Sequence, residues 1–214
     1  MTLSVIMPKG SGCSMSKSRE KINQFLAEID ITGKTVIDVG VQNNPARKYT
    51  KGETKKYMTL DIDNEWSPDL VLDINETDID LSIFTNIINA QRIRGGFDIV
   101  FCLEVLEHCW NPIEAVRNLA EFTADGGVCY ISVPFINPLH DKWDYLRYTP
   151  EWFEKVLPLV GFKDVVVKKR MATNGVLDLM TFYRNEGLRM SKIRLKAGQS
   201  KDQALIGLFV EAHK

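Results

Sequence analysis

Acidic side chains follow three successive apolar runs in the first half of the chain, each close to the point where a run ends. Asp38 lies near the end of the first run, Asp61 near the end of the second and Asp73 near the end of the third. A single Asp at a strand end often only caps the next turn, but three in order favour a shared function. Carboxylates accept hydrogen bonds from hydroxyl, amino and ammonium groups. The pattern therefore predicts a crevice that binds a polar ligand through such donors.

The turn after the first of these runs limits which ligand fits. Gly40 followed by Asp61 resembles a dinucleotide fingerprint, in which a glycine turn admits the cofactor and a later acid binds the ribose. A pyrophosphate needs several glycines so that backbone amides can approach it, whereas residues 41–45 are Val-Gln-Asn-Asn-Pro. NAD is therefore disfavoured. S-adenosylmethionine has no phosphate groups, and its parts suit the acids: Asp61 for the ribose hydroxyls, Asp73 for the adenine amino group and Asp38 for the ammonium through water.

These acids need a sheet whose strands end at one edge. The apolar and β-branched runs that we expect to form strands are 35–40, 57–62, 69–74, 97–103, 128–133, 162–169 and 205–212. Helical spacing and capping signals predict a helix around 22–29 closed by Gly33, one from Asn111-Pro112 to Gly126-Gly127, and one from Thr149-Pro150 to Gly161. Alternating strands and helices predict a mostly parallel α/β sheet, whose ligands bind beyond the carboxyl ends of the strands.

The composition is that of an ordinary globular protein. The 214 residues are 44% apolar and 26% charged, which favours a compact domain that needs no disulfide or metal to fold. The 27 Lys and Arg balance 28 Asp and Glu, so we expect no duplex nucleic acid as a partner. No run approaches the roughly 18 apolar residues of a membrane span, and the apolar N-terminus is too short for a signal segment, which predicts a cytoplasmic protein. The four cysteines lack C-x-x-C spacing, so neither disulfides nor a metal site are expected.

From about residue 35 to 167 the sequence resembles the class I S-adenosylmethionine-dependent methyltransferases, in particular small bacterial enzymes associated with polysaccharide and glycan synthesis. The motifs that carry the resemblance are, in order, 36–40 with Pro45, 60–62, 69–73, 97–100 leading to 104–108, 126–135, 139–149 and 161–162. The resemblance implies a single Rossmann-like three-layer α/β/α domain with a mostly parallel seven-stranded sheet whose last strand is antiparallel. In this interpretation residues 1–34 are an N-terminal tail and helix, and residues 35–214 are the methyltransferase domain.

The resemblance also implies which residues bind the cofactor. It places Asp38, Gly40 and Val41 at the methionine end, Asp61 and Ile62 at the ribose and adenine, Asp73 and Ile74 at the adenine edge, and Leu103 and Glu104 beneath the sulfonium. One departure is that the family usually has a second glycine where Gln42 stands, so the first loop is bulkier. Asn43 or Asn44 can take the left-handed conformation that a tight turn needs.

The acceptor side is expected to lie in the two polar segments that follow the fourth and fifth predicted strands. Methyl transfer from a sulfonium is an in-line displacement, so the protein mainly aligns donor and acceptor and removes a proton. The candidate bases are His140, His108 and Glu107, and the candidate acceptor contacts are Asp144, Tyr145, Arg147 and Tyr148. Structural roles stay open for both histidines, as a turn cap or a loop contact. The aromatic run 143–148 predicts either a wall on which a ring or sugar stacks or a packed lid at the sheet edge.

These features favour an O- or N-methyltransferase that acts on a small molecule or a glycan. The Asn/Asp-Pro-Pro-aromatic motif of DNA and RNA amino-methyltransferases is replaced by Cys102-Leu103-Glu104-Val105. The alternative function is a non-catalytic binding or scaffolding subunit that has kept the fold with an altered glycine loop. The segment 184–201 lacks apolar periodicity and is predicted to form a mobile cover over the acceptor side. The sequence leaves the oligomeric state open.

Overall fold

The protein folds around one seven-stranded sheet with the strand order β3-β2-β1-β4-β5-β7-β6, in a computed structural model that describes residues 17–42, 44–80, 82, 96–136, 142–173 and 203–214. The neighbouring pairs from β3 to β5 are parallel, and β7 runs antiparallel to both β5 and β6. The strands are β1 Thr35–Val39, β2 Lys56–Asp61, β3 Leu70–Val71, β4 Phe97–Leu103, β5 Thr123–Pro134, β6 Asp164–Thr173 and β7 Gln203–His213. The predicted fold class, including an antiparallel last strand, is confirmed.

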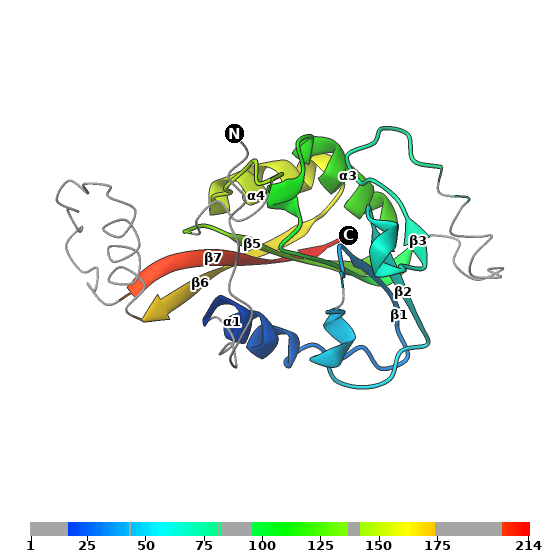
Figure 1. The fold of residues 1–214 in the computed structure, drawn as a ribbon, viewed down its shortest axis with the longest axis horizontal. Helices are drawn as coiled ribbons and strands as arrows, with labels where there is room; N and C mark the ends of the chain where they lie inside the picture. The colour runs from blue at the N-terminus through cyan, green and yellow to red at the C-terminus, as the bar shows by residue number, and fades with distance from the viewer. Residues whose placement is uncertain (1–16, 43, 81, 83–95, 137–141, 174–202) are drawn as a thin grey trace, which may run out of the picture.

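Helices cover both faces of this sheet (Figure 1). Figure 1 shows the sheet nearly edge-on, with α3 and α4 on one side and α1 on the other. The helices are α1 Lys17–Leu26, α3 Pro112–Phe122 and α4 Pro150–Val156, and the short 3-10 turns are η1 Ala46–Lys48, η2 Asn64–Trp66, η3 Leu106–His108 and η4 Leu157–Val160. On α1, Phe25 stacks on Phe209 of β7 with 4.4 Å between ring centroids. This contact fixes α1 against the sheet, while the domain boundary at residue 34 stays a prediction.

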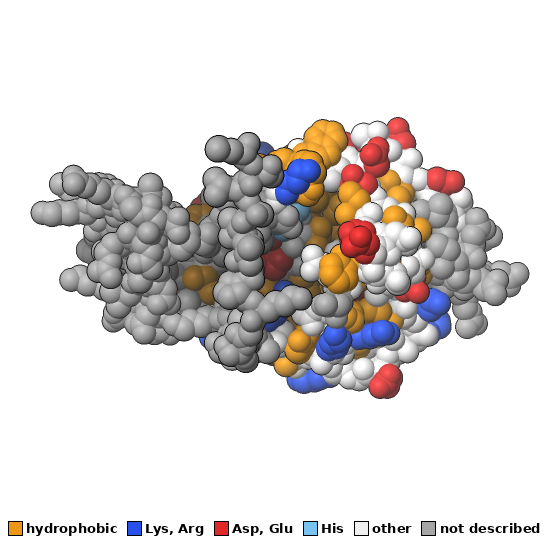
Figure 2. Space-filling model, viewed as in Figure 1, with side chains coloured by type: hydrophobic (Ala, Val, Ile, Leu, Met, Phe, Trp, Pro, Cys, Tyr) orange, Lys and Arg blue, Asp and Glu red, His pale blue; other side chains and the backbone are white. Residues whose placement is uncertain are grey.

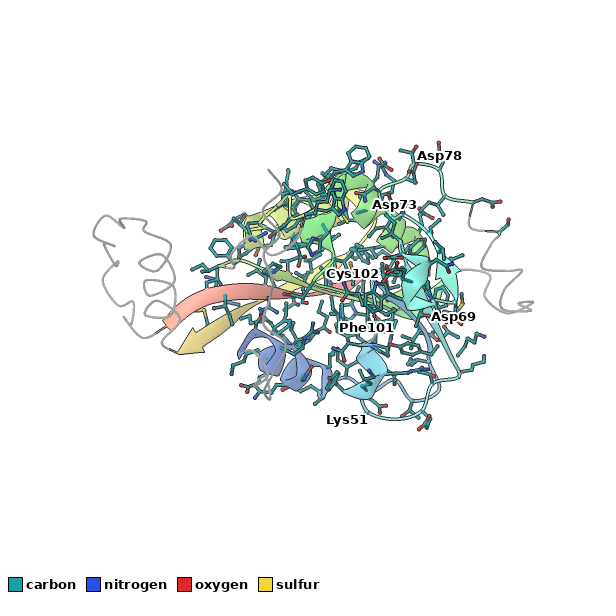
Figure 3. All side chains as sticks on the ribbon, viewed as in Figure 1. Lys51, Asp69, Asp73, Asp78, Phe101 and Cys102 are labelled. Atoms are coloured by element: carbon teal, nitrogen blue, oxygen red, sulfur yellow. The ribbon has the colours of Figure 1, made fainter. Side chains whose placement is uncertain are left out.

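The core consists of two buried clusters, one on each face. Residues of β4 alternate between them: Phe101 packs with the α1 side and Cys102 with the α3 and α4 side. Figure 3 shows these two labelled side chains at the middle of the sheet. Both are fully buried, which is the burial expected of a central strand in a parallel sheet with helices on both faces.

Three predicted boundaries are wrong. The helix that starts at Pro112 ends at Phe122, and Gly126 and Gly127 lie inside β5. A Cβ on Gly127 would lie 2.9 Å from the Phe97 carbonyl oxygen, so this glycine allows a close approach of two backbones, a role that sequence cannot distinguish from a helix stop. The first helix ends at Leu26, well before Gly33, and the third strand has two residues instead of six.

The described cysteines are buried and free of disulfides: Cys102, Cys109 and Cys129. Burial raises the pKa of the Cys109 thiol to about 12, so it packs as a small hydrophobe. None of the helices in the described ranges is long and apolar enough to cross a membrane. The predicted cover 184–201 lies outside the described residues.

Candidate functional site

A pocket of about 220 Å³ opens where β1 and β4 end, and residues of α1 also line it. The residues that line it are Arg19, Leu26, Asp38, Val39, Gly40, Val41, Gln42, Asn44, Tyr49, Leu103, Glu104 and His108. The predicted cofactor residues Asp38, Gly40, Val41, Leu103 and Glu104 are therefore brought together. The six other lining residues were not assigned to the site by sequence reasoning: Arg19, Leu26, Val39, Gln42, Asn44 and Tyr49. Helical spacing describes only the buried face of α1, and no motif marks the loop residues Asn44 and Tyr49.

Asp38 at the end of β1 is buried and organises the loop that follows it. Its Oδ2 accepts hydrogen bonds from the Ala46 amide at 2.7 Å and from the Tyr57 hydroxyl. Burial raises the pKa of the Asp38 carboxyl to about 6, against the lowering effect of these two donors. Asp38 is thus an acid that is mostly ionised at neutral pH and faces the pocket.

The next turn brings the backbone close to Val105, just after β4. Gly40 has φ +72°, and a Cβ there would lie 2.3 Å from Val105 Cγ2. Only glycine relieves both constraints. Two residues later, Gln42 itself adopts the left-handed conformation, with φ +45°. The departure from the family pattern is therefore accommodated by Gln42 at its own position, while Asn43 lies outside the described residues.

Asp61 at the end of β2 is joined to that same turn. Its Oδ2 accepts from the Gln42 amide at 3.1 Å and its Oδ1 from the Asp63 amide at 3.1 Å. A carboxylate has about four acceptor positions, so two remain for ligand hydroxyls. The following Ile62 is 62% exposed. Neither Asp61 nor Ile62 lines the pocket, and Asp61 is joined to it through the lining residue Gln42.

The third predicted acid has a local role. Asp73 Oδ1 accepts from the Asn75 amide at 2.8 Å and from its side-chain Nδ2 at 2.7 Å. Asn75 in turn accepts from the Asn111 amide, ahead of α3. Figure 3 places the labelled Asp73 on the α3 side of the sheet, and Ile74 beside it is buried in the core. The structure thus shows Asp73 as a turn cap, and its contact with adenine stays a prediction.

Glu104 follows β4 in a strained conformation, with φ +57°. Its amide donates to the Ser132 carbonyl at 2.9 Å, and its Oε1 accepts from Ser132 Oγ at 2.9 Å. The buried Arg170 lies 3.0 Å from Glu104 Oε1. Arg170 belongs to β6, far along the chain, and sequence reasoning missed it because nothing in the pattern of that strand distinguishes it from its exposed lysines.

Glu107 and His108 stand together on η3. Glu107 is fully buried, and neither of its carboxyl oxygens accepts a hydrogen bond from the described part of the chain. Burial, reinforced by the charge of Glu104, raises the pKa of Glu107 to about 8. Nε2 of His108 lies 3.8 Å from Glu107 Oε1, and its Nδ1 lies 3.1 Å from the Trp143 carbonyl oxygen. A carbonyl oxygen only accepts, so Nδ1 carries the proton and Nε2 has the lone pair in the neutral ring.

The four predicted acceptor residues differ in burial and in hydrogen-bond partners. Asp144 and Arg147 form a two-pronged ion pair with each other. Tyr145 is 47% exposed, whereas Tyr148 is buried and its hydroxyl donates to the Leu106 carbonyl at 2.7 Å. For Tyr148 the packing interpretation therefore holds in the structure. His140 lies outside the described residues.

The donor set of the pocket suits S-adenosylmethionine. This cofactor carries an ammonium, a carboxylate and a sulfonium, and the pocket presents the carboxylates of Asp38 and Glu104 together with the guanidinium of Arg19. Gly40 lines the pocket, and its missing side chain leaves the space that the Val105 side chain fills. Within the described ranges, no three His, Cys, Asp or Glu side chains are grouped so that they could hold a metal ion.

Comparison with known sequences finds a family model and several curated relatives. The model described as "Methyltransferase domain" matches residues 15–159. A ubiquinone biosynthesis O-methyltransferase of Shewanella pealeana is 30% identical over 104 residues, which are 48% of this chain and 44% of the relative. One of the same name from Sodalis glossinidius is 30% identical over 154 residues, 71% of this chain and 55% of the relative. The chain thus spans about half the length of these curated relatives.

Comparison with solved structures shows the same fold in proteins of distant sequence. A SAM-dependent methyltransferase from Archaeoglobus fulgidus superimposes with a TM-score of 0.59 at 13% identity, over 93% of this chain and 95% of the other. A putative methyltransferase from Bacillus halodurans gives a TM-score of 0.54 at 14% identity, over 90% and 96% of the two chains. At these identities the likeness is one of fold.

Proposed function

Because the chain belongs to the methyltransferase domain family, we propose that it transfers a methyl group from S-adenosylmethionine to an oxygen of a small-molecule acceptor. Family membership confirms the predicted class of enzyme, its Rossmann-like fold and S-adenosylmethionine as the cofactor of that class. The acceptor and the identity of the base belong to the proposal. The curated relatives named as O-methyltransferases support oxygen as the acceptor atom.

The observation that carries the proposal is the His108–Glu107 pair at the pocket wall. His108 lines the pocket, and its Nδ1–H donates to the Trp143 carbonyl, so that Nε2 is the basic nitrogen of the neutral ring. Glu107 lies 3.8 Å from that nitrogen. Because burial raises its pKa to about 8, the Glu107 carboxyl is mostly protonated at neutral pH, and it stabilises the imidazolium as an anion only once it has lost that proton. Such a pair suits a hydroxyl acceptor, which must lose a proton as its oxygen bonds to carbon.

The chain's own residues do three things in this mechanism. When bound, S-adenosylmethionine supplies the electrophilic methyl group on a cationic sulfur. Asp38 and Arg19 orient the amino-acid head, and Glu104 and His108 line the same pocket. His108 Nε2 takes the proton of the acceptor hydroxyl during the in-line displacement, so that a neutral ether leaves the pocket.

The surface beside His108 favours a flat acceptor. Trp143 is 52% exposed and Tyr145 is 47% exposed, with 6.3 Å between their ring centroids. The backbone of the same segment is tied to η3, because the Tyr145 amide donates to the Glu107 carbonyl at 2.8 Å. Figure 2 shows hydrophobic side chains exposed on this view over the α3 and α4 side. Exposed rings held next to a base suit an aromatic hydroxyl compound, and they also allow a sugar to stack.

The test is methyl transfer measured with catechol as an aromatic probe and a glycan oligosaccharide as its competitor. Replacing His108 with Gln should lower turnover of catechol by about 10²–10⁴-fold, while the affinity for S-adenosylhomocysteine stays within a few-fold. The matched control is His213→Gln, because His213 on β7 also pairs with a glutamate, Glu211, at 3.0 Å.

Two results would contradict the proposal. Full turnover in His108→Gln would remove the histidine from proton transfer. Transfer to an amine or to the glycan, with none to catechol, would overturn the assignment of the acceptor.

A further inference from the structure

Arg170 is a buried arginine whose position is not explained by packing alone. It is 1% exposed in the middle of β6, an edge strand. Its Nη2 donates to the Val133 carbonyl at 3.0 Å and to Glu104 Oε2 at 3.2 Å. Its Nε and Nη1 are buried and have no hydrogen-bond partner in the described part of the chain. Burying a guanidinium with two unsatisfied donors costs free energy. This cost indicates that Arg170 has a role besides packing.

The side chain crosses the sheet to reach its partner. Between β6 and β4 lie β7 and β5, so three strand spacings, roughly 14 Å, separate the two backbones. Only two long side chains that reach toward each other close this distance, and Arg170 and Glu104 do so with 3.0 Å between Nη2 and Oε1. The contact joins the edge of the sheet to the wall of the pocket.

The strand between them is shaped to let the guanidinium pass. Gly207 of β7 pairs with Arg170, and a Cβ there would lie 2.1 Å from Nη2 and 2.3 Å from Nε. Phe209, two residues further along β7, lies under the guanidinium at 5.3 Å from Cζ to the ring centroid. Gly207 thus leaves space for the guanidinium, and the Phe209 ring packs against it.

At the other end, Glu104 is held in a costly conformation. Its φ of +57° is strained for a residue with a side chain, and the Ser132 hydroxyl holds the same carboxylate at 2.9 Å. Glu104 lines the pocket together with Asp38. The Glu104 carboxylate at the pocket therefore combines a strained backbone with a buried cationic partner that has its own packing site.

We propose that Arg170 is a positioning residue of the cofactor pocket, which holds the Glu104 carboxylate in place and offsets its negative charge beside the bound sulfonium. The proposal rests on the proposed function. The physical reason is that the positive charge on sulfur is lost as the methyl group leaves, so a bare carboxylate stabilises the bound S-adenosylmethionine more than the transition state. A carboxylate paired with Arg170 keeps its hydrogen-bonding geometry and exerts a weaker field.

The experiment compares the affinities for S-adenosylmethionine, which is a cation at sulfur, and S-adenosylhomocysteine, which is neutral there, by calorimetry on the full chain. Arg170→Met should shift the ratio of the two dissociation constants at least about threefold toward S-adenosylmethionine. Arg170→Lys retains a charge and should restore most of the wild-type ratio. Gly207→Ala should shift the ratio in the direction of Arg170→Met, because its Cβ displaces the guanidinium while the pocket residues stay intact.

The control and the double variant separate positioning from stability. Lys168→Met removes a cation on the same strand that also lies over a phenylalanine ring and beside a glutamate, Phe25 and Glu211, and it should leave the ratio unchanged. In a Glu104→Gln background, Arg170→Met should have no further effect on the ratio, since the carboxylate it offsets is gone.

Three results would overturn the inference. One is an equal loss of affinity for both ligands in Arg170→Met and Gly207→Ala, which is the mark of general damage. Another is a full effect of Arg170→Met in the Glu104→Gln background. If the wild-type chain binds neither ligand, the proposed function itself fails, and the role of Arg170 at that site fails with it.

Discussion

Two acidic regions, each with one pocket-lining carboxylate, Asp38 or Glu104, differ in how their carboxylates are hydrogen-bonded. Asp38 of β1 and Asp61 of β2 each accept hydrogen bonds from backbone amides of the loops that follow these two strands, namely those of Ala46, Gln42 and Asp63. At the end of β4 and on η3, Glu104 depends on a distant arginine, and neither carboxyl oxygen of Glu107 accepts a hydrogen bond from the described residues. The carboxylates of the first region have hydrogen-bond donors in these loops. The second carries strain and unmet hydrogen bonds, which proteins retain where chemistry needs them.

The largest effect is expected where a ligand contact and loop support coincide. Asp61→Ala removes the acceptor for the Gln42 and Asp63 amides together with any contact to the ribose. We expect S-adenosylhomocysteine binding to weaken by about 1.5–3 kcal/mol, measured by calorimetry. Asp69→Ala is the control, because Asp69 likewise binds a backbone amide, that of Thr59, outside the pocket. Equal affinity in wild type and Asp61→Ala would remove Asp61 from the cofactor site.

The second effect concerns Glu107 and the stability of the fold. The pKa of this carboxyl is raised from 4.5 to about 8 in the folded state, so between these values the folded state holds a proton that the unfolded state has lost. Stability from this group is present below pH 4.5 and is lost as the pH rises to about 8. Glu107→Gln should therefore raise the free energy of unfolding, measured by urea denaturation at pH 8–9, by about 2 kcal/mol.

The exposed Glu121 on α3 provides the control for that measurement. Glu121→Gln should follow the wild-type dependence of the urea midpoint on pH. A parallel dependence in Glu107→Gln would show that another group dominates the titration.

The third effect is a pH dependence of ligand affinity that arises from Asp38 in the first region. The pKa of Asp38 is raised to about 6, and protonation removes the acceptor for a ligand ammonium. Affinity for S-adenosylhomocysteine should fall about tenfold for each pH unit below 6, while Asp38→Asn should give a weak and nearly flat profile. A flat profile in the wild-type chain would show that Asp38 does not bind the amino-acid head.

The smallest effect is expected at the departure from the family pattern. Gln42→Gly relieves a left-handed φ of +45°, and against the entropy of glycine this should change the free energy of unfolding by no more than about 1 kcal/mol. Affinity for S-adenosylhomocysteine should stay within about twofold because the Gln42 amide still reaches Asp61. A large gain in affinity would show that the glutamine side chain obstructs the pocket.

Local patterns predicted most of the fold. The β-branched run predicted at 35–40 forms β1, which ends at Val39, and the apolar run at 97–103 forms β4, because buried parallel strands leave little choice of residue. The end of α3 was wrong because a glycine pair that admits a neighbouring backbone looks the same in sequence as one that stops a helix. The place of β7 between β5 and β6 was also beyond sequence reasoning, since strand pairing depends on contacts between distant segments.

The sequence by itself determined the acids at the strand ends, the glycine turn at Gly40 and the motif that carries Glu104, Glu107 and His108, because each depends on spacing along one short segment. The tertiary structure decided which of these share a pocket and in what state. It placed Arg19 of α1 on the pocket wall, left Asp73 in a turn, buried Glu107 and drew Arg170 across two strands to Glu104. Burial, charge and partnership arise from segments that meet only in the folded chain, and these fix the pKa and the contacts of each side chain.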